Sequence, residues 1–146
     1  MLPQKLSVFY TRDLTKLKEE IQSYTDEKEL WKISGDVKNS AGNLCLHLLG
    51  NLNHFIGFAI GNTNYIRERE KEFSEKNIPA AQLILTIDKT ILMIEKTFSS
   101  LTENDFQKKY PLQTPLKEPS IEEFMVHLLT HLNYHLGQIN YHRRLE

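Results

Sequence analysis

Apolar residues recur every three or four positions along most of this sequence, and that spacing is typical of amphipathic helices. One such stripe consists of Leu6, Phe9, Leu14, Leu17, Ile21 and Tyr24. Another consists of Leu83, Ile84, Ile87, Ile91, Ile94 and Phe98. No alternating pattern of the kind that marks a strand extends over more than a few residues. The sequence therefore predicts an all-α protein.

Capping residues locate the middle helices. Asn39 or Ser40 offers an N-cap for a second helix, which is expected to run to about Gly61. Pro79 is tolerated in the first turn of a helix and marks the start of the third. Trp31 lies in the connection after the first helix and is expected to cover one end of the core.

The last helix follows a long loop over residues 102–119, where three prolines prevent helix formation. Ser120 to Glu123 spells a capping box, so the helix should begin there and run nearly to Glu146. Four helices of about 20 residues with connecting loops are typical of an up-and-down four-helix bundle. Residues 1–146 have the size of one such domain.

Charge and composition exclude several classes of function. The net charge is -1, and no cluster of lysine and arginine suggests a nucleic-acid partner. No segment approaches the roughly 18 apolar residues of a membrane span, so no membrane partner is expected. A single cysteine cannot form an intrachain disulfide, and Arg12 and Asp13 interrupt any signal-peptide pattern. These features predict a soluble, cytoplasmic protein.

The charged run from Arg67 to Glu72 lies between the second and third helices. Such a run is typical of a solvated face. The alternative is that it attracts an acidic substrate.

Histidine is concentrated near the end of the sequence, with four of the six in the last twenty residues. His131 and His135 are four residues apart, so on a helix they share one face and can bind the same metal ion. Phe124 and Leu128 lie near the same direction, which points the pair into the core. Gln138 returns to this face and could orient a bound water or ligand.

A third ligand must come from another helix, and the second helix offers His47 and His54 on one face. His47 is flanked by leucines, which directs it inward, whereas His54 could equally be a rim residue. Three neutral imidazoles leave an ion its full charge and an open coordination position. Such an ion lowers the pKa of bound water to about 7 or binds a thiol as thiolate.

The other histidines and the cysteine have ordinary interpretations. His127 is rotated off the metal-binding face and is expected to pack or to lie at the rim. His142 adjoins Arg143 and Arg144 and is expected to be solvated. Cys45 faces away from His47 and is expected to be a small core residue.

Two motifs resemble the DinB/YfiT-like superfamily of metal-dependent four-helix-bundle proteins. Residues 131–138, HLNYHLGQ, match the HxxxHxGQ signature of its terminal helix. Residues 46–51, LHLLGN, resemble its second-helix ligand motif. The similarity extends over nearly the whole chain, and the stretch 38–52 resembles an uncharacterised branch of the superfamily.

The resemblance implies a site for nickel, zinc, manganese or iron, with His47, His131 and His135 as ligands. It also implies a homodimer. Some members transfer low-molecular-weight thiols such as bacillithiol or mycothiol onto electrophiles. The leading hypothesis is therefore a metal-dependent thiol S-transferase acting on a small-molecule substrate in detoxification or stress response.

Asn51, Tyr134, Tyr141 and Gln138 are the candidates for orienting or acid–base roles around this site. A metal-dependent hydrolase is the nearest rival, although no carboxylate adjoins the histidines in sequence to act as general base. A non-catalytic, metal-binding dimer is the third alternative.

Overall fold

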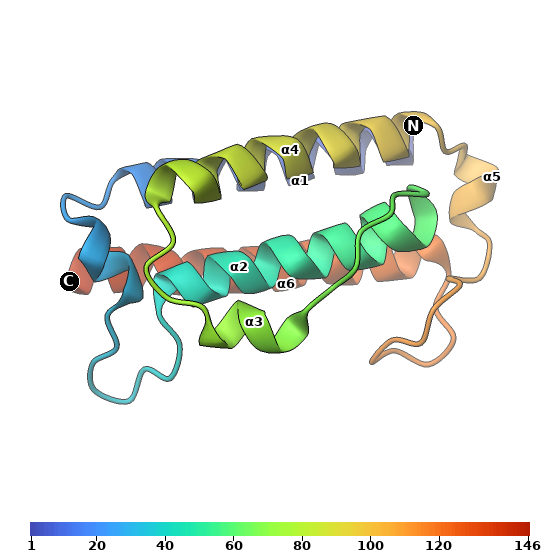
Figure 1. Cartoon of the computed structure of the whole chain (residues 1–146). Coiled ribbons are helices and arrows are strands. Elements are labelled where there is room, and N and C mark those ends of the chain that lie inside the picture. The colour runs from blue at the N-terminus through green and yellow to red at the C-terminus, as the bar shows by residue number, and fades with distance from the viewer.

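A computed structural model describes residues 1–146, which form an all-helical structure without strands. The α-helices are α1 (Leu2–Gln22), α2 (Ala41–Leu52), α3 (Arg69–Ser74), α4 (Ala80–Ser99), α5 (Glu103–Phe106) and α6 (Ile121–Leu145). A 3-10 helix, η1 (Glu27–Trp31), precedes α2, and a π-helix, η2 (Asn53–Phe58), continues it. The long helices α1, α2, α4 and α6 lie side by side around one apolar core (Figure 1).

The N-caps that the sequence indicated at Ser40 and Ser120 are confirmed, whereas the reciprocal contact that would complete a capping box at Ser120 is absent. The Ser40 hydroxyl accepts a hydrogen bond from the Asn43 amide at 3.1 Å and starts α2. The Ser120 hydroxyl accepts one from the Glu123 amide at 3.1 Å and starts α6. Pro79 is the residue directly before α4. The starts of α2 and α6 therefore follow from side-chain caps, and α4 starts directly after a proline.

Side-chain contacts between helices establish their directions. Helix α1 runs antiparallel to α4 and parallel to α6 (Figure 1). The pairs that define these directions are Thr11–Glu95 and Lys18–Asp88 between α1 and α4, and Asp13–Asn133 and Glu20–Asn140 between α1 and α6.

Helices α2 and α4 run in the same direction, which differs from the strictly alternating, up-and-down order expected from the sequence. Asn53 donates a hydrogen bond to Thr90 at 2.9 Å, and Gly61, further along, packs against Thr97. The reason is the segment 59–79, which includes α3 and returns the chain to the end where α2 begins (Figure 1). This crossover lays α3 over α2.

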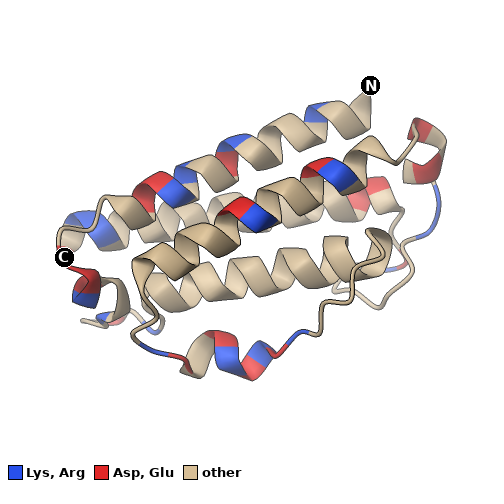
Figure 2. Ribbon diagram, turned by 45° about the horizontal axis from the view of Figure 1, so that its top comes forward, with Lys and Arg blue, Asp and Glu red and all other residues tan.

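Helix α2 is the central element of the fold. All its residues except Leu46 are buried, and it carries no charged side chain, unlike α1, α3 and α4 (Figure 2). Trp31 of η1 is buried, as expected, and packs so closely on α2 that a Cβ atom at Gly42 would lie 2.6 Å from its ring. No helix combines the length and apolar character needed to cross a membrane. A polar side chain on α2 is therefore shielded from solvent on most sides.

Candidate metal centre

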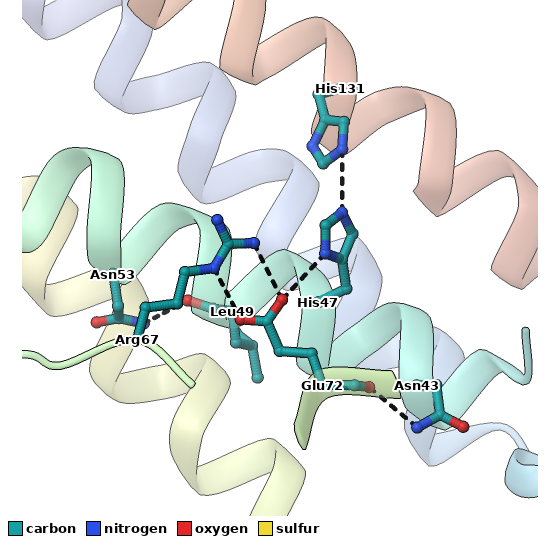
Figure 3. Close-up of polar contacts among 7 residues, drawn as sticks. All are labelled: Asn43, His47, Leu49, Asn53, Arg67, Glu72 and His131. Carbon is teal, nitrogen blue, oxygen red and sulfur yellow. Dashed lines mark hydrogen bonds and ion pairs between the residues drawn. The ribbon is translucent and has the colours of Figure 1, made fainter. Parts of the chain in front are cut away.

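Three imidazoles meet between α2 and α6. One nitrogen from each of His47, His131 and His135 lies within 4.8 Å of the others, close enough to hold a metal ion. Nε2 of His47 is 3.3 Å from Nε2 of His131 (Figure 3). Two nitrogens bound tetrahedrally to one zinc ion at the usual bond length would be about 3.3 Å apart. The spacing of these two nitrogens therefore fits a shared metal ion.

Glu72 of α3 determines which nitrogen of His47 faces the other imidazoles. Its Oε1 lies 3.1 Å from His47 Nδ1 (Figure 3). An ionised carboxylate can only accept a hydrogen bond, so Nδ1 carries the proton and Nε2 presents its lone pair toward His131. Carboxylate–histidine pairs of this kind orient metal ligands and raise their basicity.

Gln138 plays the equivalent part for His135. Its Oε1 lies 2.7 Å from His135 Nδ1, one turn away on α6. The amide oxygen accepts, so Nδ1 of His135 donates and Nε2 remains free to bind a metal. The sequence placed Gln138 on the metal-binding face, and the structure brings it to the histidine itself.

His131 has no such partner. Its Nδ1 and Oδ1 of Asn51 are the two buried side-chain polar atoms that lack a hydrogen bond. The pKa of His131 is lowered to about 4, first by burial and then by the neighbouring His135 and His47. Burial also lowers the pKa of His135. Both rings are thus neutral at neutral pH, which is the form that binds metal.

The structure reveals two site residues that the sequence interpretation missed, Glu72 and Arg67. Arg67 donates from Nε to Glu72 Oε2 at 2.9 Å and from a terminal nitrogen to Oε1 at 3.0 Å. Burial by itself would raise the pKa of Glu72, but the hydrogen bonds from His47 and Arg67 bring it below its ordinary value. The expectation of a solvated face was therefore wrong for these two residues, although the four between them are exposed. The one feature of the sequence that pointed to a contact here is Gly50, because a glycine inside a buried helix indicates that another segment packs closely against it.

His54, the alternative third ligand, lies outside the cluster. Its ring stacks on Phe58 at 5.8 Å between centroids, with 6° between the planes. Burial lowers its pKa. Of the two candidates for the third ligand, the structure brings His47, and not His54, to His131 and His135.

The remaining sequence candidates have packing roles or lie at the surface. His127 stacks on Phe124 at 5.7 Å, in agreement with its predicted packing role. Cys45 is fully buried, and burial raises the pKa of its thiol to about 12, so it stays protonated. Tyr134 and Tyr141 are 66% and 65% exposed, and the Tyr134 ring lies 5.3 Å from that of His135.

The prediction that His142 is solvated was wrong. Its side chain is buried, with Nδ1 2.6 Å from the Tyr24 hydroxyl and Nε2 2.8 Å from the Lys32 carbonyl oxygen. The segment that follows α1 folds over the end of α6 and supplies both partners. The adjacent Arg143 is partly exposed and pairs with the buried carboxylate of Glu20 at 2.6 Å.

A cleft of about 640 Å³ opens beside His135, between α6 and the segment before α2. This volume is within the range of small-molecule binding sites. The lining residues on α6 and α2 are Leu44, Tyr134, His135, Gln138, Tyr141, His142 and Leu145. One of the three metal-binding candidates therefore faces a space large enough for a substrate.

These features define an all-helical protein with a three-histidine cluster, bordered by a ligand-sized cleft. Residues 5–145 match the family described as "Protein of unknown function (DUF1572)", and the chain belongs to that family. No curated protein matches the sequence.

Proposed function

We propose that this protein is a divalent-metal-dependent enzyme and a member of the DinB/YfiT-like four-helix bundles, acting as a low-molecular-weight thiol S-transferase. The observation that carries the proposal is the cluster of His47, His131 and His135, whose third member faces the cleft. Neutral imidazoles suit nickel, zinc or iron, and the family resemblance adds manganese. A closed structural site would not need a cleft at one of its ligands.

A bound ion would supply a positive charge that lowers the pKa of a thiol and raises its thiolate fraction. That thiol must come from a substrate, because Cys45 is the chain's one cysteine and is fully buried. Gln138 holds His135 at the wall of the cleft, and Tyr134 stands exposed beside it. Both can contact a molecule bound there.

Glu72 gives little support to the hydrolase alternative. A general base for water attack must reach the face of the site where substrate binds. Glu72 instead contacts His47 at Nδ1, on the far side of the ring from Nε2, and both its oxygens are engaged by Arg67. Thiol transfer needs no such base, since the metal promotes thiol deprotonation.

The test is an assay of a small thiol with a model electrophile, using protein stripped by chelation and reloaded with each metal in turn. We expect turnover that requires both thiol and metal and is lost in His131→Ala. Ester or amide hydrolysis without added thiol would favour the hydrolase. Metal binding with neither activity would favour a non-catalytic metal-binding protein. Light scattering on the same preparation tests the homodimer that the family resemblance implies.

A further inference from the structure

Helix α3 is attached to α2 by polar contacts that follow one face of α2. Asn43 donates from Nδ2 to the backbone oxygen of Glu72 at 3.0 Å (Figure 3). It also donates from Nδ2 to the backbone oxygen of Glu75 at 2.8 Å. One turn further along α2, His47 meets the Glu72 side chain. Both ends of Glu72, its backbone and its carboxylate, are therefore held by α2.

Gly50 completes this face of α2, three residues after His47. A Cβ atom built at Gly50 would overlap the Glu72 carboxylate, so only glycine leaves the space that this carboxylate occupies. A glycine inside a helix costs about 1 kcal/mol relative to alanine. The close approach of Glu72 gives a physical reason for accepting that cost.

Arg67 fixes the Glu72 carboxylate from the other side. It contacts both oxygens, and the side chains of Arg67 and Glu72 are only 11% and 6% exposed. A bidentate arginine restricts both the position and the rotation of a carboxylate. The direction of the hydrogen bond at His47 is thereby set by residues outside α2 and α6.

We propose that Glu72 is a positioning residue of the metal centre. It holds His47 with the proton on Nδ1 and Nε2 toward His131, so docking of α3 and metal binding stabilise each other. This inference rests on the metal-binding part of the proposed function and is independent of thiol transfer. The competing explanation is that Glu72 only attaches α3 to the helices beneath it.

The first experiment measures Zn²⁺ affinity by competition with a chromophoric chelator. We expect Glu72→Ala and Gly50→Ala to weaken binding by about 10- to 100-fold, the usual effect of losing a residue that orients a ligand. Glu72→Gln keeps an acceptor oxygen and should lose less. The matched control is Glu68→Gln. Glu68 is exposed, lies directly before α3 and pairs with Lys71 inside that helix.

The second measurement separates positioning from attachment. Imidazole ¹⁵N NMR of the metal-free protein should show His47 protonated at Nδ1 in the wild type, Glu68→Gln and Glu72→Gln, and a mixture of tautomers in Glu72→Ala. Zinc should slow amide hydrogen exchange in α3 of the wild type but not of Glu72→Ala. If α3 is only attached, neither the tautomer nor the zinc effect on exchange depends on Glu72.

Unchanged zinc affinity in Glu72→Ala and Gly50→Ala would overturn the role of Glu72, as would a wild-type His47 protonated at Nε2. Should Glu72→Ala not fold, Glu72→Gln and Gly50→Ala decide the question. Wild-type protein that binds none of Zn²⁺, Ni²⁺, Mn²⁺ and Fe²⁺ would instead refute the proposed function, and the linkage with it. The two failures are thus distinguishable.

Discussion

Helix α6 carries histidines in two settings that differ in how their ring nitrogens are satisfied. Near its C-terminal end, His142 has both nitrogens within hydrogen-bond distance of chain partners, Tyr24 and Lys32. In its middle, His131 has an unpartnered Nδ1 and an Nε2 that faces another imidazole nitrogen. The ring nitrogens of His142 are satisfied without a ligand, whereas those of His131 are not.

The contrast gives a physical criterion for a ligand histidine. Because Glu72 holds the proton of His47 on Nδ1, Nε2 of His47 carries a lone pair. This nitrogen lies 3.3 Å from Nε2 of His131. Nε2 of His131 either carries a proton and donates it, or carries a second lone pair that faces the first. Two opposed lone pairs repel unless a cation lies between them. A third imidazole within reach of both makes a metal ion the cation that fits this arrangement.

The largest expected effect is the loss of metal binding in His131→Ala or His135→Ala. Each removes one of three ligands, so about one tightly bound ion per chain should become none. Helical content should stay intact, because the apolar core does not depend on these rings. Metal analysis after gel filtration and circular dichroism measure the two properties. Full metal occupancy in both variants would move the site elsewhere.

Zinc should stabilise only those variants that keep the cluster. At a free zinc concentration of 100 times Kd, the free energy of unfolding should rise by about 2.7 kcal/mol. We expect this increment in the wild type and in His142→Ala, and none in His131→Ala. Urea unfolding with and without chelator measures it. An equal increment in His131→Ala would show that zinc binds at another place.

His142→Ala should act in the opposite way, on stability and not on metal binding. It leaves the Tyr24 hydroxyl and the Lys32 carbonyl without their partner, at a cost of roughly 2 kcal/mol in the free energy of unfolding. Zinc affinity should match that of the wild type. A large fall in zinc affinity would place His142 in the metal centre and remove the distinction between the two settings.

Local rules predicted the parts of the site that lie within one helix. The i, i+4 spacing of His131 and His135 and the N-cap at Ser120 depend only on nearby residues, and the structure has both as expected. The leucines that flank His47 also indicated that it points inward, although the sequence kept His54 as an alternative third ligand.

The contacts that cross between elements could not be predicted in this way. Glu72 lies 25 residues after His47 and directly follows four exposed residues, and only the crossover through α3 brings it to His47. His142 adjoins two arginines, and its burial depends on the segment that packs over the end of α6. The parallel direction of α2 and α4 has the same origin, because the path of a long connection leaves no periodic pattern in the sequence.

The smallest expected effect is that of His54→Ala on metal binding. His54 shares a helical face with His47 in the sequence, but its ring stacks on Phe58, packs edge-on against Phe55 and stands outside the cluster. Substitutions at sites without shared partners usually act independently, within a few tenths of a kcal/mol. Zinc affinity should therefore change by less than about twofold, whereas His47→Ala should lose tight binding. Chelator competition on the two variants in parallel tests this ranking. The reverse order would make His54 the third ligand, and Glu72 would then have no ligand to orient.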